Sequence, residues 1–269
     1  PVLDGALQTF ATLKGAVVPI NDPVDLARRL GGVSNIPATV PDPQAPYRIG
    51  DRKTFHAMNQ DTTERFTVDT VLRAANDAAY FWIEDGVPYD QEELDYLMEQ
   101  FALRIVPTNR EFFGSEWSPG IDEDPRLFIV YARNLGSISG VFSASDSYPP
   151  QVREDSNAHE MFFISADTAL LNESFTFGVL AHEFQHMIHW YRDRNEESWV
   201  NEGFSELAAF LNDYDLGGFD YVFSLDPDTQ LNDWPVDQDT TIPHYGASFL
   251  LMSYFLDRFG EDASKALVG

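Results

Sequence analysis

The sequence predicts an α+β fold in which strands dominate the first part of the chain and helices dominate the last. Segments rich in β-branched and aromatic residues lie mostly between residues 47 and 165, and three long segments with helical spacing follow from about residue 175. An apolar fraction of 43% over 269 residues is enough for a hydrophobic core. We therefore expect a twisted, mostly antiparallel sheet packed on the first of these helices, with a β-rich N-terminal extension.

The elements follow one another in a simple order. Asn21-Asp22-Pro23 predicts a helix start, Gly31-Gly32 predicts its end, and a Pro-rich linker follows over residues 37–47. Strands are predicted at residues 54–58, 66–74, 78–84, 127–131, 140–143 and 161–165. Helices are predicted at residues 90–105, 175–192, 198–212 and 246–259.

This order predicts three regions. Residues 1–46 form a helical lead-in and linker that is a candidate pro-segment, and residues 47–88 form a β-rich region. Residues 89–269 form the region that carries the motifs described below, and we expect it to be truncated at its C-terminal end. We found no internal repeat.

Composition excludes several classes of protein. A net charge of −27 repels phosphate groups, so neither nucleic acid nor an anionic membrane is an expected partner. No apolar run approaches the 18 or so residues that would predict a membrane span. The absence of cysteine excludes disulfides, thiolate metal ligands and a Cys nucleophile. Because the chain begins at Pro1 without a signal peptide, we expect a secreted protein whose export signal has been removed.

The main candidate site is the stretch His182-Glu183-Phe184-Gln185-His186. Residues four apart lie on one face of a helix, so both imidazoles can reach one zinc ion. Glu183 lies about 100° around the helix, where it can take a proton from water at that ion. The alternative is a helix whose two histidines have only structural roles. The apolar residues around the motif predict a buried helix, on which two histidines need partners.

The third ligand is expected from the next helix. Glu202 follows His186 by 16 positions, which allows a turn and an antiparallel return. We expect Asn201 and Glu206 to lie just behind the ligands, with Glu206 accepting the second ring N–H of His182. His189 lies about 10.5 Å along the helix from His182, too far to share the ion. Its predicted place is behind the ligands or at the surface.

These motifs resemble those of the gluzincin zinc metallopeptidases. The stretch of residues 182–188, with Trp199-Val200-Asn201-Glu202-Gly203, is most similar to hyicolysin-type secreted bacterial peptidases, and the resemblance covers roughly residues 126–260. It implies a zincin-like fold, one catalytic zinc ion and hydrolysis of peptide bonds in proteins. The chain has no Gly-x-Met-Glu-Asn motif, the anchor of aminopeptidases for a free amino terminus, which favours an endopeptidase. The metzincin class is excluded because residue 189 is His and residue 192 is Arg.

The resemblance also implies an oxyanion donor and a strand that binds substrate. Tyr245 is the first choice as donor and His244 the second, in the stretch before the last predicted helix; a packed aromatic residue is the structural alternative. For the substrate-binding strand, one candidate is residues 139–143, and the other is Asn157 and Ala158 before the strand at residues 161–165.

Two further alternatives remain open at this stage. Acidic loops could bind calcium, although solvated loops are favoured because no EF-hand pattern is present. Their residues are Asp226, Asp228, Asp233, Asp237 and Asp239, with Asp122, Glu123 and Asp124. Instead of a peptidase, the chain could be a non-catalytic surface binding or adhesion domain on a peptidase scaffold, or a hydrolase of a non-peptide amide. The sequence does not predict the cleavage preference or the oligomeric state.

Overall fold

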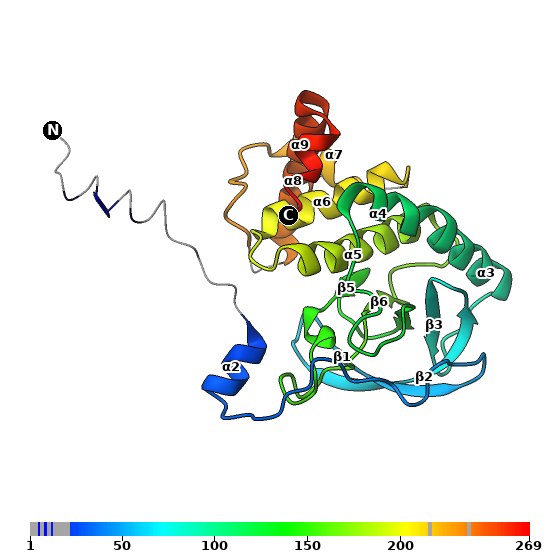
Figure 1. The fold of residues 1–269 in the computed structure, drawn as a ribbon. Coiled ribbons are helices and arrows are strands. Elements are labelled where there is room, and N and C mark those ends of the chain that lie inside the picture. Colours follow the sequence, from blue (N-terminus) through cyan, green and yellow to red (C-terminus); the bar gives the residue numbers. More distant parts are fainter. Residues whose placement is uncertain (1–4, 6–7, 10–11, 13–21, 215–216, 236–237) are drawn as a thin grey trace.

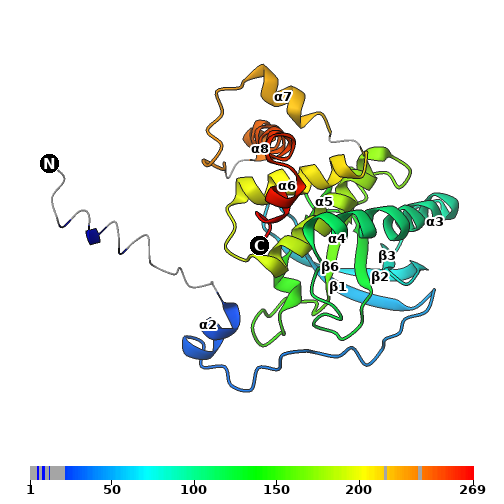
Figure 2. The ribbon, with the colours of Figure 1, turned by 45° about the horizontal axis from the view of Figure 1, so that its top comes forward.

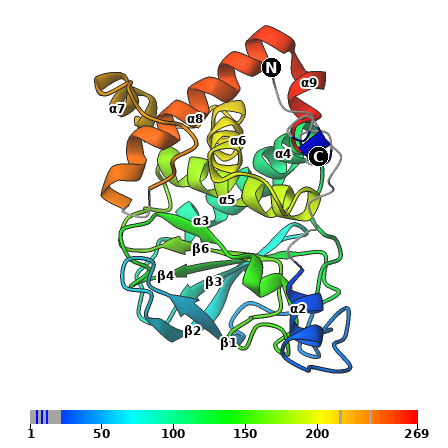
Figure 3. The same ribbon diagram turned by 90° about the vertical axis from the view of Figure 1, so that its left-hand side faces the viewer.

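The computed structural model describes residues 22–214, 217–235 and 238–269, together with residues 5, 8, 9 and 12. Within this part of the chain, one sheet lies on one side of the molecule and the helices α3 to α9 lie on the other (Figure 3). The short helix α2 (Pro23–Arg29) lies beside the sheet, away from the other helices (Figure 1). Its start is the predicted one, because the Asp22 side chain accepts a hydrogen bond from Val24 N. None of the described helices is both long enough and apolar enough to cross a membrane.

The sheet has six strands in the order β1-β2-β3-β4-β6-β5. They are β1 (Arg52–Met58), β2 (Arg65–Ala75), β3 (Ala79–Glu84), β4 (Leu127–Ala132), β5 (Gly140–Phe142) and β6 (Met161–Ser165). The pairings β1–β2, β2–β3 and β5–β6 are antiparallel, whereas β3–β4 and β4–β6 are parallel. The predicted α+β class is confirmed, with a mixed sheet. This sheet runs across residue 88, and the three-region division stays a prediction.

Both faces of the central strands are buried, which explains their continuous apolar runs. In β3, Phe81 and Ile83 pack toward the helices, whereas Tyr80 and Trp82 pack on the opposite face. On that opposite face β1 and β2 curve round beneath the other strands (Figure 1), so that Phe55 packs edge-on against Trp82 and Phe128. The curvature closes a second core to which no described helix contributes a buried residue.

The helical side begins with α3 (Gln91–Gln100), which continues through a π-helical turn, η1 (Phe101–Ile105), into α4 (Val106–Phe113). The predicted helix at 90–105 is therefore confirmed but is longer than expected. The 3₁₀ turn η2 (Ala144–Ser147) lies between β5 and β6. The helices α5 (Ser174–Arg192) and α6 (Ser198–Leu211) match their predicted ranges closely and form the expected hairpin.

The last part of the chain differs most from expectation. Helix α8 (Gln238–Phe259) begins eight residues earlier than the predicted start at residue 246, and Pro243 lies inside it. Two short helices, α7 (Phe219–Leu225) and α9 (Glu261–Lys265), had no clear sequence signal. Gly203 in α6 allows α8 to approach closely, because a Cβ there would lie 2.9 Å from the Ser248 carbonyl oxygen. Helix α8 therefore packs closely across α6, and Figure 2 shows it nearly end-on beside that helix.

Candidate metal centre

Two histidines of α5 and one glutamate of α6 converge at the centre of the helical layer. The Nε2 atoms of His182 and His186 are 2.9 Å apart. Glu202 Oε2 lies 3.2 Å from Nε2 of His182 and 3.3 Å from Nε2 of His186. Among the residues that the structure describes, these three form the only group of three or more such side chains close enough to hold one metal ion. The α5–α6 hairpin thus brings together the three residues that the sequence predicts as ligands.

The outer ring nitrogens of both histidines face acceptors, which tests whether the group suits a metal ion. His182 Nδ1 lies 3.1 Å from Glu206 Oε1. His186 Nδ1 lies 3.0 Å from Asn201 Oδ1 and 2.9 Å from Ser205 Oγ. In each neutral imidazole a proton on Nδ1 leaves a bare lone pair on Nε2. Two lone pairs and a carboxylate then point at one spot, an arrangement that requires a cation, and the donor set fits zinc.

The pKa shifts of these side chains also indicate that the group is stabilised by positive charge. Burial alone lowers the pKa of His182, but the carboxylates of Glu202 and Glu206 outweigh it and raise that pKa well above its ordinary value. Burial raises the pKa of Glu202, but His186 and His182 reverse this effect and hold the pKa of that carboxyl far below its usual range. Protons or a metal ion must therefore supply positive charge here, and the two compete for the same atoms.

Glu183 is held by the edge strand β5. Its Oε2 accepts a hydrogen bond from the Phe142 backbone N–H at 2.7 Å, and the side chain is only 5% exposed. Burial raises the pKa of Glu183 above its ordinary value. Gly140 permits this contact, because a Cβ on that residue would lie 2.8 Å from the Glu183 Oε1 and 2.5 Å from a methyl group of Val179. The sequence did not indicate this role of β5.

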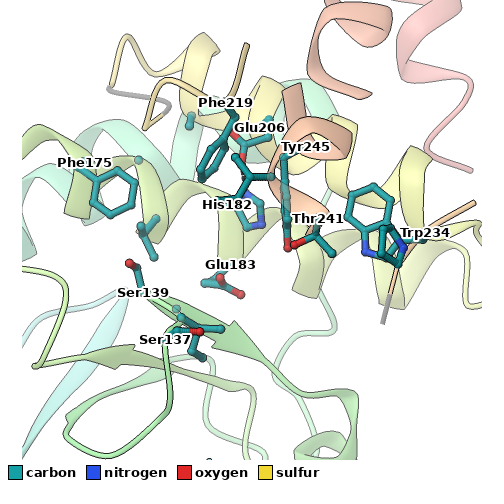
Figure 4. A pocket seen from close by; sticks show the side chains of 17 residues that line it. Ser137, Ser139, Phe175, His182, Glu183, Glu206, Phe219, Trp234, Thr241 and Tyr245 are labelled. Carbon is teal, nitrogen blue, oxygen red and sulfur yellow. Dashed lines mark ion pairs between the residues drawn. The ribbon is translucent and has the colours of Figure 1, made fainter. Parts of the chain in front are cut away.

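A cavity of about 540 Å³ opens beside His182 and Glu183 (Figure 4). Aromatic side chains from three helices and one loop line it, namely Phe175, Phe219, Trp234 and Tyr245. On the strand side it is bounded by residues 137–140, and Thr241 of α8 lies beside Tyr245 (Figure 4). A glutamate, a histidine and an apolar wall therefore face one open cleft.

Of the two predicted oxyanion donors, the structure brings Tyr245 to the cavity. The ring centroids of Tyr245 and His182 are 6.3 Å apart, and the tyrosine lines the cavity. Burial and the nearby carboxylates raise the pKa of Tyr245 well above its ordinary value, so its hydroxyl keeps its proton. His244 is not part of the lining; its ring packs against Trp234 and its Nδ1 lies 3.2 Å from the Thr240 carbonyl oxygen.

The structure does not bring Asn157 and Ala158 to the cavity. The Asn157 amide donates to the His56 carbonyl oxygen and to Asp146 Oδ1, and Ala158 is buried. Of the two candidate substrate strands, only the one at residues 139–143 therefore adjoins the candidate metal centre. His189 is 1% exposed and connects through Gln185 and Ser205 to His186. Of its two predicted positions, behind the candidate ligands or at the surface, the structure shows the first.

The acidic loops show no ligand cluster in the described residues. Asp122 and Asp124 are occupied by other partners, His159 and Arg126 respectively. Asp226, Asp228 and Asp233 are exposed, Asp237 lies outside the described residues, and the side chain of Asp239 is likewise outside the description. Calcium binding stays a prediction.

Comparison with known proteins supports the class of site that the geometry indicates, a metallopeptidase centre. No family model matches the chain. A neutral metalloprotease, ShpI, from Staphylococcus hyicus is 21% identical over an alignment that covers 61% of this chain and 41% of that protein. The predicted resemblance to zinc metallopeptidases is thus confirmed, although the chain spans less than half the length of this relative.

Two solved structures were also found, both of an M1 zinc metallopeptidase from Deinococcus radiodurans, one of them a mutant. Each is 13% identical to this chain, with TM-scores of 0.40 and 0.39. The matches cover 81% of this chain and 44% and 43% of those chains.

Proposed function

We propose that this chain is the catalytic part of a zinc-dependent endopeptidase of zincin-like fold and gluzincin type. The observation that carries the proposal is the convergence of two Nε2 lone pairs and the Glu202 carboxylate, while both Nδ1 atoms face acceptors. His182, His186 and Glu202 would hold the ion. A zinc ion held there supplies a Lewis acid that activates water and polarises a carbonyl group.

Glu183 is the proposed general base. It follows His182 directly, so its carboxylate lies beside the ligands without joining them, and it faces the cavity. The Phe142 N–H holds one carboxylate oxygen, which leaves the other free to take the proton of the attacking water. Because burial raises its pKa, Glu183 can then pass that proton to the leaving amine.

Tyr245 is the proposed donor to the oxyanion. Its hydroxyl stays protonated, and α8 holds the side chain over the cavity beside His182. A fixed donor of this kind stabilises negative charge that develops on the substrate oxygen in the transition state.

The substrate is proposed to be an extended peptide that pairs with the free edge of β5. The Ser139 carbonyl oxygen accepts from Ser165 N, so it points toward β6. Backbone groups alternate in direction along a strand, and those of Gly140 therefore face the open edge next to the cavity. Strand addition at this edge would place a peptide bond beside Glu183. We further propose that the reaction takes place outside the cell, as the sequence predicts.

The test combines metal analysis with a peptidase assay. We expect about one zinc per chain and hydrolysis of a quenched peptide or casein that stops with chelator and returns with zinc. Glu183→Gln should retain the zinc while kcat falls by roughly 10²–10⁴-fold. Bound zinc without any hydrolysis would instead favour the non-catalytic binding domain, and failure to bind zinc would refute the centre itself.

A further inference from the structure

A buried polar chain leads away from His186 and does not reach the cavity. It consists of Ser205 from α6 and Gln185 and His189 from α5, which are 0%, 0% and 1% exposed. None of the three lines the cavity. They lie instead in the tightly packed interface between the two helices, surrounded by apolar residues of the main core. The proposed chemistry does not use any of them.

The hydrogen bonds of this buried polar chain have a defined direction. Ser205 Oγ lies 2.5 Å from Gln185 Oε1 and 2.9 Å from His186 Nδ1. The amide oxygen has no proton to give, so the single hydroxyl proton points to Gln185, whereas the other acceptor, the Asn201 carbonyl oxygen, is farther away at 3.0 Å. The hydroxyl therefore keeps a lone pair for His186. That lone pair favours the tautomer with a proton on Nδ1 of His186 and a bare Nε2.

The buried polar chain continues from Gln185 to His189. Gln185 Nε2 lies 3.3 Å from His189 Nδ1, and this contact fixes the amide that receives the Ser205 proton. The His189 ring packs edge-on against Phe204, with centroids 5.9 Å apart, which limits its rotation. At the far end, Glu196 Oε2 is 3.9 Å from His189 Nε2, where the chain approaches the exposed end of the hairpin.

Packing alone does not require these polar groups. A buried polar pair can often be replaced by apolar groups of similar shape with little loss of stability, whereas leaving one partner unpaired is costly. The apolar side chains around the chain already join α5 to α6. The buried polar chain is thus best explained by its hydrogen bond to His186, through which it can act on the proposed metal ion. The other histidine ligand is held differently, by the carboxylate of Glu206.

We propose that Ser205, Gln185 and His189 are positioning residues that hold His186 in one tautomer and orientation and thereby set the affinity of the centre for zinc. This inference rests on the proposed metal centre but not on the identity of the substrate. It distinguishes the two proposed histidine ligands: the neutral polar chain and the Asn201 amide oxygen orient His186, whereas a charged carboxylate orients His182. Outer hydrogen bonds of metal ligands typically contribute 10–100-fold to metal affinity.

The experiment measures zinc binding directly, by competition with a chromophoric chelator, for the wild-type protein and two variants. Ser205→Ala and Gln185→Met each remove the link while keeping most of the side-chain volume. We expect each to weaken zinc binding by about 10–100-fold. The double variant should be hardly weaker than either single one, because both act through the same chain. Two independent positions keep the test valid if one variant does not fold.

Thr176→Val is the matched control. Thr176 is also buried in α5, and its hydroxyl donates to the Leu170 carbonyl oxygen at 2.5 Å. It is neither a proposed ligand nor part of the buried polar chain. We expect this variant to lower the Tm of the metal-free protein and to leave the zinc Kd unchanged. If Ser205→Ala and Gln185→Met lower the metal-free Tm but keep the zinc Kd within twofold, the buried polar chain has only a structural role and the proposal is wrong. If the wild-type protein itself binds no zinc, the proposed function fails first.

Discussion

Replacement of Gly140 by alanine should uncouple the proposed base, Glu183, from the proposed metal site. The added methyl group would lie 2.5 Å from a Val179 methyl group and 2.8 Å from both Cγ and Oε1 of Glu183. Carbon atoms in ordinary contact are about 3.5–4.0 Å apart, so β5 would have to move from α5 by about 1 Å. The hydrogen bond from Phe142 N, now 2.7 Å long, would then approach 3.7 Å and be lost.

The expected magnitudes follow from this displacement. Overpacking of this kind costs about 1–3 kcal/mol of unfolding free energy, which for a chain of this size lowers Tm by about 2–6 °C. A base misplaced by about 1 Å should reduce kcat by about 100-fold. Zinc content should be unchanged, because the three proposed ligands lie on α5 and α6 and do not move with the strand.

The assay compares Gly140→Ala with Val141→Ala in zinc content, Tm and kcat. Val141 lies in the same strand, but its side chain packs on the core of the opposite face, so its truncation should destabilise the sheet while kcat remains near wild type. A folded, zinc-loaded Gly140→Ala protein with wild-type turnover would refute the role assigned to β5. An equal loss of kcat in the Val141→Ala control would refute it as well.

Two other predictions concern the oxyanion donor and the dependence of stability on pH. Tyr245→Phe should lower kcat by about 10²–10³-fold with zinc retained, and His244→Gln should change kcat by less than about threefold; the reverse order would exchange their roles. Burial raises the pKa of Glu160 to about 8 from an ordinary 4.5, so the folded protein holds a proton there that the unfolded chain releases. Its contribution to stability is therefore present below pH 4.5 and is lost as pH rises to about 8, by at most about 5 kcal/mol. Glu160→Gln should flatten the fall of Tm between pH 5 and 9, and an unchanged slope would contradict this assignment.

The helix positions of the site could be predicted from the sequence because they depend on local geometry. Four residues make about one helical turn, so His182 and His186 had to share a face wherever that helix lay. The interval of 16 residues between His186 and Glu202 contains a polar turn and is short, so the next helix had to return Glu202 to the two histidines. Most strand and helix segments of the first two hundred residues could also be predicted, since apolar periodicity reports burial directly, although α4 was not expected.

Only the tertiary structure decided which distant segments meet. β5 precedes β6 in the chain but lies outside it in the sheet, and this order brings Gly140, rather than Asn157, to the cavity. The choice between Tyr245 and His244 depended on where α8 begins, because neighbouring residues of a helix point about 100° apart. The buried polar chain of Ser205, Gln185 and His189 forms only because α5 and α6 pack side by side with these residues at the same level. Local propensity fixes backbone shape within a few turns, whereas the packing of whole elements determines which side chains share a site.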